Sequence, residues 1–232
     1  MMQLFMTTPL FGLGLTILVG LLALYIKSKV TWNLFNPMLF SIVLIITVLV
    51  AFNIPYENYT LGGDYIMKML GPITVVLAVP LYQHHDKLKK HAFAILFGII
   101  LGSLSALVSV YIFGLIVGLD MTLIKSLLPR SVTTPIGIAS SEMIDGLVGL
   151  TVLSIVITGT FGAIAADWVY KVFNITDPIA KGVALGTSAH AIGTGRAFEY
   201  GSLEGAMSGL SIAIAGVSTI LWLLLFQFLG FI

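Results

Sequence analysis

Apolar residues run through this chain in long stretches, and short polar segments separate one stretch from the next. A helix needs about 20 apolar residues to cross the hydrocarbon core of a bilayer, so stretches of this length predict membrane-embedded helices. The candidate segments are Pro9–Ile26, Leu34–Asn53, Tyr65–Gln83, Ala92–Leu119, Met121–Ser140, Gly146–Tyr170, Ile179–Gly195 and Ala206–Ile232. Hardly any residues remain for an extramembrane domain. We therefore expect an all-α, polytopic helix bundle of about eight hydrophobic segments, forming a single integral-membrane domain over residues 1–232.

Composition supports the same placement. The chain is 58% hydrophobic and only 9% charged, whereas soluble domains carry about 25% charged residues. The first residues, MMQLFMTTPLFGLG, contain no basic stretch and no small-residue cleavage site. We therefore expect the first segment to remain as a span rather than to be removed as a signal peptide, and the lipid bilayer to be the first partner of this protein.

Several chemistries are excluded by the residue types that the chain lacks. It contains no cysteine, which rules out disulfides, thiolate nucleophiles and Cys-ligated metals. No basic run with interleaved aromatic residues points to nucleic acid. The signatures of zinc hydrolases, serine hydrolases and P-loop nucleotide sites are also missing. We expect a protein that is not an enzyme, with no catalytic residues, no metal site and no cofactor.

Lysines predict the orientation of the first half of the chain. Lys27 and Lys29 follow the first segment, Glu57 and Asp64 lie in the next loop without a base, and the third loop, QHHDKLKKH, is again basic. Short basic loops stay on the cytoplasmic side, so we expect the N-terminus outside and the first and third loops inside. The third loop could instead be a metal or lipid site. Beyond residue 120 the charges are mixed and support an orientation less strongly.

An unusually polar stretch, LPRSVTTPIGIASSEMIDG, occupies residues 128–146. Pro135 lacks an N–H group and clashes with the preceding turn, Pro129 suits the first turn of a helix, and Gly137 adds backbone freedom. We expect a discontinuous or re-entrant helix with Arg130 near the middle of the membrane, where a charge usually faces a cavity and has a function. The alternative is a Pro-kinked helix whose arginine extends to the membrane surface.

A second polar stretch, GTSAHAIGTGRA, starts at Gly186 and contains Arg196, the other of only two arginines in the chain. The planar guanidinium fork matches a carboxylate or phosphate. Tight helix packing is the alternative explanation for the glycines of this stretch. Together the two stretches predict one anion site, with Arg130, Ser131, Thr133, Thr134, Ser188, His190, Thr194 and Arg196 as substrate-binding residues. The expected broken-helix or packing residues are Pro129, Pro135, Gly137, Gly186, Gly193 and Gly195.

Three titratable residues lie in or next to these stretches. His190 could carry a coupled proton, because imidazole titrates near physiological pH. Glu142 could pair with an arginine or hold a proton. Asp145 is expected to cap the start of the next helix, where an acidic residue is favourable.

A weak internal sequence similarity links two regions of the chain. The pattern K-x-L-x-P occurs at Lys68 and again at Lys125, and the same offset brings Gly102 onto Gly159. Duplication of a helical hairpin would produce such a similarity. Internal repeats are common in secondary transporters, so a true repeat would favour a transporter.

Four stretches in this order, AVPLYQHHDKLKKH, LLPRSVTTPIGI, DPIAKGVALG and ALGTSAHAIGTGRAFE, resemble the LrgB/CidB family of bacterial membrane proteins. The resemblance covers nearly the whole chain. The chain departs from the family at Asp145–Gly146, where relatives commonly have two glycines, and this puts the local turn in doubt. The positions that match the family's motifs are Arg130, Ser131, Thr133, Thr134, Pro135, Gly186, Thr187, Ser188, His190, Gly193, Thr194 and Arg196.

The resemblance implies a function. Members are described as antiholin-like or holin-like proteins that modulate murein hydrolase activity and cell lysis, usually with a smaller membrane partner of the LrgA/CidA type. Plastid relatives are glycolate/glycerate translocators, and bacterial members are linked to pyruvate transport. We therefore expect a dimeric secondary carrier, or carrier subunit, for small monocarboxylates in the bacterial plasma membrane. The alternative is a non-transporting regulator or pore component that acts through the small partner.

Overall fold

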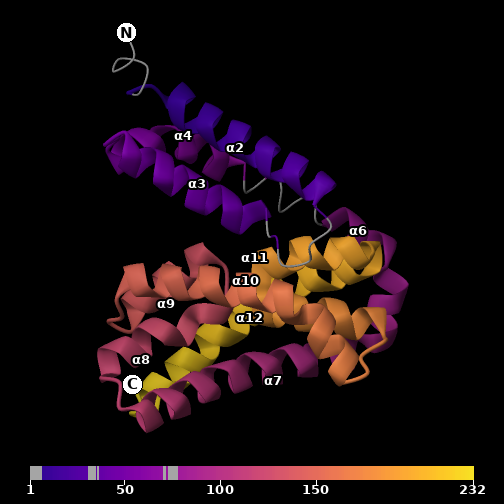
Figure 1. The fold of residues 1–232 in the computed structure, drawn as a ribbon. Helices are drawn as coiled ribbons and strands as arrows, with labels where there is room; N and C mark the ends of the chain where they lie inside the picture. Colours follow the sequence, from indigo (N-terminus) through magenta and orange to yellow (C-terminus); the bar gives the residue numbers. More distant parts are fainter. Residues whose placement is uncertain (1–6, 31–34, 36, 70–71, 73–77) are drawn as a thin grey trace. The chain divides into compact units, whose positions relative to one another are not determined.

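The computed structural model describes residues 7–30, 35, 37–69, 72 and 78–232, which form helices and connections without a strand among them (Figure 1). Four of the described helices are long and apolar enough to cross a membrane, which confirms the expected all-α membrane helix bundle. They are α2 (Pro9–Lys29), α7 (His85–Val117), α10 (Val148–Val172) and α12 (Ser202–Phe228). The chain divides into two compact units, Met1–Val76 and Leu77–Ile232.

Two glycines allow close packing between two helices of the first unit. Its other described helices are α3 (Pro37–Ala51) and α4 (Tyr56–Lys68). A Cβ atom on Gly12 of α2 would lie 2.1 Å from the carbonyl oxygen of Tyr59 in α4, and one on Gly62 would lie 2.4 Å from that of Pro9. The backbones of α2 and α4 therefore approach as closely as small-residue helix interfaces in membranes allow.

Two sequence predictions fall partly outside the described residues of this region. The segment Tyr65–Gln83 is not one helix, since α4 ends at Lys68 and α6 (Ala78–Gln83) belongs to the second unit. Residues 70–71 and 73–77 lie outside the described residues, and with them part of the first K-x-L-x-P pattern. The internal repeat therefore stays a prediction.

Three long helices, α7, α10 and α12, frame the second unit. In Figure 1, α6 lies at one end of this unit, and α8 (Met121–Leu127) lies at the other end with the C-terminus. Leu107 of α7 packs with Leu223 and Phe226 of α12 in a buried cluster near the C-terminal end. The N-terminal end of α7 meets the start of α12, where His84 Nε2 lies 3.1 Å from Ser202 Oγ.

The first polar stretch folds into a hairpin, which we call the α8–α9 hairpin. It consists of α8, a 3₁₀ turn η1 (Leu128–Ser131) and α9 (Thr134–Met143). After α9 the chain returns to α8, because the Leu147 N–H donates a 2.7 Å hydrogen bond to Ser126 Oγ. Ile124 and Ile144 also share one buried cluster. The helix break that the prolines predict is therefore observed, and the chain turns back at η1.

The second polar stretch also turns back on itself. The helix α11 (Pro178–Tyr200) is interrupted at His190, whose backbone has φ 43° and ψ −131°. Across this break, a Cβ atom on Gly193 would lie 2.6 Å from the carbonyl oxygen of Leu185. The Lys181 ammonium lies 5.9 Å from the centre of the Tyr200 ring, although a straight helix would separate these residues by about 28 Å. We call this element the α11 hairpin.

The two hairpins correct the segment count. The hydrophobic pattern predicts candidate spans at Met121–Ser140 and Ile179–Gly195 and leaves open whether each crosses or re-enters. Each of these segments is two short helices that fold back, so neither is a continuous span. The expected cap at Asp145 is also wrong: α10 begins after Leu147 with no side-chain cap, and Asp145 occupies a turn with φ 58°.

Candidate functional site

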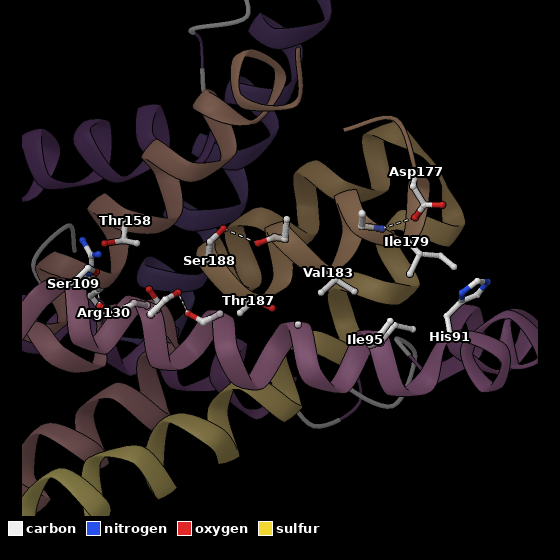
Figure 2. Close-up of a pocket in the computed structure, with 18 residues that line it drawn as sticks. His91, Ile95, Ser109, Arg130, Thr158, Asp177, Ile179, Val183, Thr187 and Ser188 are labelled. Carbon is white, nitrogen blue, oxygen red and sulfur yellow. Dashed lines mark hydrogen bonds between the residues drawn. The ribbon is translucent and has the colours of Figure 1, made fainter. Parts of the chain in front are cut away.

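A cavity of about 930 Å³ runs between α7 and the first half of the α11 hairpin. We call it the α7–α11 pocket. Figure 2 shows Arg130, Thr158 and Ser109 at one end of it and His91 and Asp177 at the other. The walls between the two ends carry small and apolar side chains: Ala94, Gly98, Gly102, Ala106, Ala180, Val183 and Ala184. The cavity therefore leads along an apolar passage to one arginine.

Arg130 is the cationic group at one end of this pocket. It lies in η1, at the turn of the α8–α9 hairpin. Its Nε is buried and has no hydrogen-bond partner, and no carboxylate of the described residues forms an ion pair with it. A buried donor without a partner is costly, and a charge inside a membrane protein is usually retained for a function. The geometry at Arg130 therefore suits an anionic ligand.

Hydroxyl groups from three elements accompany this arginine. Ser131 of η1, Thr158 of α10, and Thr187 and Ser188 of the α11 hairpin all line the pocket. The hydroxyl of Thr187 is buried without a hydrogen-bond partner, as is the Nε of Arg130. A carboxylate on the guanidinium fork with a second oxygen on a hydroxyl is chemically reasonable here.

The second arginine is placed elsewhere. Arg196 lies in the returning half of the α11 hairpin and does not line the α7–α11 pocket. Its Nη2 donates a 2.6 Å hydrogen bond to Asp167 of α10, and its Nη1 is paired with Glu199. The structure therefore does not bring the two arginines together in one pocket. Arg196 already has two carboxylate partners: Asp167 ties the hairpin to α10, and Glu199 lies within the hairpin itself.

Two more members of the second stretch face neighbouring helices. His190 is buried, and its Nε2 donates to the carbonyl oxygen of Ile155 at 3.1 Å, since a carbonyl only accepts. Thr194 donates to the His190 carbonyl oxygen and lies 2.8 Å from Ser208 of α12. Neither residue lines the pocket. Their contacts fix the turn of the α11 hairpin, and proton coupling by His190 stays a prediction.

The remaining predicted site residues shape the first hairpin. Thr133 is the N-cap residue of α9 without a side-chain cap bond, and Thr134 and Pro135 form the first turn of that helix. Pro129 is buried in η1. None of these residues lines the pocket. They build the turn that presents Arg130 and Ser131.

The predicted packing glycines divide into two groups. A Cβ atom on Gly137 would lie 2.3 Å from Ile155 Cδ1, and one on Gly186 would lie 2.2 Å from the carbonyl oxygen of Ser208. Gly186, like Gly193 in the α11 hairpin, faces backbone and has no room for a Cβ atom, whereas Gly137 faces the end of a side chain that would have to shift. Gly195 differs, because a Cβ atom there would meet nothing within 4 Å. Packing therefore does not explain Gly195.

Acidic residues do not gather around the pocket. Glu142 is exposed at the end of α9, so pairing with Arg130 is not observed. Asp177 lies at the opposite end of the pocket and caps α11 by accepting the Ala180 N–H at 2.8 Å. Within the described part of the chain, no three histidine or acidic residues are arranged to hold a metal ion.

Three pocket residues were missed because they lie in long apolar helices. Ser105 and Ser109 of α7 and Thr158 of α10 are surrounded in the sequence by aliphatic residues. A single hydroxyl residue in such a helix is not by itself a sign of a binding site. A signal existed in α7: Gly98, Gly102, Ser105 and Ser109 are small residues spaced by three and four positions. This spacing places them on one face of a helix.

Comparison with known proteins places the chain in a family. The family model described as LrgB-like matches residues 16–228. The protein YwbG of Bacillus subtilis (strain 168), described as uncharacterized, is 39% identical over 90% of this chain and 93% of its own length. Proteins named antiholin-like protein LrgB are 36% identical in Bacillus mycoides (strain KBAB4) and 35% identical in Bacillus cereus (strain B4264), over 96% of this chain and 98% of their lengths. No solved structure matches the chain.

Proposed function

The chain belongs to the LrgB-like family, and from that premise we propose that it carries small monocarboxylates such as pyruvate or glycolate across the bacterial plasma membrane. It would act as a multi-pass secondary transporter or as a subunit of one. Two helical hairpins that meet beside a cavity resemble the broken helices at which secondary transporters bind their substrates.

The observation that carries this proposal is the unpaired Arg130. A guanidinium group with a buried, partnerless Nε at the end of an apolar passage binds a carboxylate more readily than a cation or a neutral solute. The hydroxyls of Ser131, Thr158 and Ser188 can hold the 2-oxo or 2-hydroxy oxygen of the same molecule. The substrate would leave the arginine without covalent chemistry, so no enzymatic step is required.

The direct test is uptake of labelled pyruvate and glycolate into proteoliposomes. We expect saturable uptake by the native protein. Arg130→Lys should raise KM about tenfold or more, because a lysine loses the second hydrogen bond of the fork, worth about 1.5 kcal/mol. Arg130→Gln should abolish uptake. Lys171→Gln removes one exposed charge outside the pocket and should leave KM unchanged.

Two results would contradict parts of this proposal. Absence of saturable uptake, both alone and with a co-reconstituted small LrgA/CidA-type protein, would overturn the proposal. Equal uptake by the native protein and Arg130→Gln would remove Arg130 from the site while leaving transport intact.

A second candidate function follows from the relatives that are named antiholin-like. The chain would then be a non-transporting regulator or pore component that controls murein hydrolase activity and cell lysis through a small holin-like partner. Its dimer and that partner would dock on helix faces with small residues. Gly14 and Gly20 of α2 are open small positions, since neither has a heavy atom within 4 Å of an added Cβ.

Co-purification separates the two functions. The regulator should lose its partner in Gly14→Leu and Gly20→Leu and keep it in Arg130→Gln. The transporter should lose uptake in Arg130→Gln and keep it in both glycine variants. Cell lysis alone does not discriminate, because altered carboxylate flux would also change it.

A further inference from the structure

Arg130 borders a second cavity in addition to the α7–α11 pocket. This cavity of about 520 Å³, which we call the α7–α10 pocket, lies beside the C-terminal part of α7 and the middle of α10. Among the described residues, Ser109, Arg130 and Thr158 line both cavities. These three residues therefore form the boundary between the two.

The three boundary residues belong to three different elements, and only one of them is charged. Ser109 belongs to α7, Arg130 to η1 and Thr158 to α10, and Figure 2 shows them together at one end of the α7–α11 pocket. The Ser109 hydroxyl donates to the Ala106 carbonyl oxygen at 2.7 Å. Arg130 is thus the dominant positive group at this point, and its Nε lacks a protein partner.

The two cavities follow one helix over the thickness of a membrane. The α7–α11 pocket touches α7 from His91 to Ser109, and the α7–α10 pocket continues from Ser109 to Val117. At 1.5 Å per residue, the helix from His91 to Val117 is about 39 Å long. The hydrocarbon core is about 30 Å thick. The two cavities together therefore follow α7 over a length sufficient to cross the core.

From this arrangement we infer that α7 lines an anion route through the protein, with its narrowest point at Arg130, Ser109 and Thr158. The α7–α10 pocket is its second vestibule. A positively charged constriction favours anions and excludes cations. The inference rests on the proposed function, since it supplies the path of the carried monocarboxylate, and it assigns positioning roles to Ser109 and Thr158.

The chain contains no cysteine, so single cysteines can map this route without background. Gly98→Cys reports on the first vestibule, Ser109→Cys on the constriction and Phe113→Cys on the second vestibule. An added Cβ at Gly98 meets nothing within 4 Å. The matched controls are Phe97→Cys and Ile112→Cys, exposed neighbours on α7 that line neither cavity. The probe is an anionic, membrane-impermeant methanethiosulfonate, applied to right-side-out and everted vesicles.

We expect the two vestibule cysteines to react at least tenfold faster than their neighbours, because a lipid-facing thiol is neither hydrated nor ionised. Gly98→Cys should react from one side of the membrane and Phe113→Cys from the other. Pyruvate at saturating concentration should slow modification of Ser109→Cys, and adding Arg130→Gln should slow the anionic reagent about tenfold relative to a neutral one.

Two results distinguish this inference from the proposed function. If Phe113→Cys reacts no faster than Ile112→Cys while the native protein transports pyruvate, the route along α7 is wrong and transport stands. If the vestibule cysteines react as expected and no uptake is measured, the route stands as an anion-accessible path and the transporter proposal is wrong.

Discussion

At the scale of single residues, the two arginines differ in their partners, and so should the effects of removing them. Arg196→Gln breaks the contacts with Asp167 and Glu199. These groups are partly exposed, so we expect a loss of about 1 kcal/mol or less per pair. The melting temperature in detergent should fall by a few degrees, and KM for uptake should change by less than twofold.

Arg130→Gln should leave the melting temperature unchanged or raise it, since it removes an unsatisfied buried donor. The same variant should abolish uptake. A matched pair of measurements, melting temperature and uptake for both variants, therefore assigns the two roles. A loss of uptake in Arg196→Gln with an unchanged melting temperature would instead show that Arg196 takes part in substrate binding.

Residue type pointed to Arg130, Ser131 and Ser188, which line the α7–α11 pocket, but it could not separate Arg196 from them. Arg196 and Asp167 are 29 positions apart and meet only because the α11 hairpin packs on α10. The same packing turns His190 and Thr194 toward α10 and α12 instead of the pocket. Which group a polar side chain contacts depends on the tertiary structure. A list of polar residues taken from the sequence therefore contains more residues than line the pocket.

At the scale of elements, Gly159 of α10 controls the turn of the α11 hairpin. A Cβ atom there would lie 2.6 Å from His190 Cε1, so Gly159→Ala must displace the imidazole from its bond with Ile155. We expect a loss of about 1–3 kcal/mol from this buried hydrogen bond and the overpacking. Thermal unfolding in detergent and uptake should both show the defect.

The matched control is Gly149→Ala in the same helix. An added Cβ at Gly149 meets nothing within 4 Å, and alanine is about 1 kcal/mol more favourable than glycine inside a helix. Gly149→Ala should therefore be neutral or stabilising. Equal melting temperatures for the two variants would show that Gly159 does not hold the His190 turn.

The two hairpins were not equally visible in the sequence. Pro129 and Pro135 bracket the first turn, and a proline removes a backbone donor at a fixed place, so the break could be located. The turn of the α11 hairpin has no proline. It depends on His190 in a backbone conformation with positive φ, which the contacts to Ile155 and Gly159 maintain, and such contacts cannot be read from local sequence.

At the scale of the whole molecule, the hairpins account for the mixed charges beyond residue 120. In the second unit, the connections on either side of the α8–α9 hairpin lie at one end, and those on either side of the α11 hairpin lie at the other. The end with the start of α7 carries the basic residues Lys87, Lys89, Lys90, Lys171, Lys181 and Arg196. The other end has Lys125 alone. Eight full crossings would scatter these residues over both faces, whereas two re-entrant hairpins collect them on one.

This distribution predicts that the basic end is cytoplasmic, in agreement with the orientation expected from the first loops. Single cysteines at Met121 and Leu147, before and after the α8–α9 hairpin, should both react with an impermeant thiol reagent from outside. Thr176→Cys and Ser202→Cys, before and after the α11 hairpin, should react only in everted vesicles. If either hairpin crossed the membrane instead, the two members of its pair would label from opposite faces, because a single crossing reverses the side on which the chain emerges.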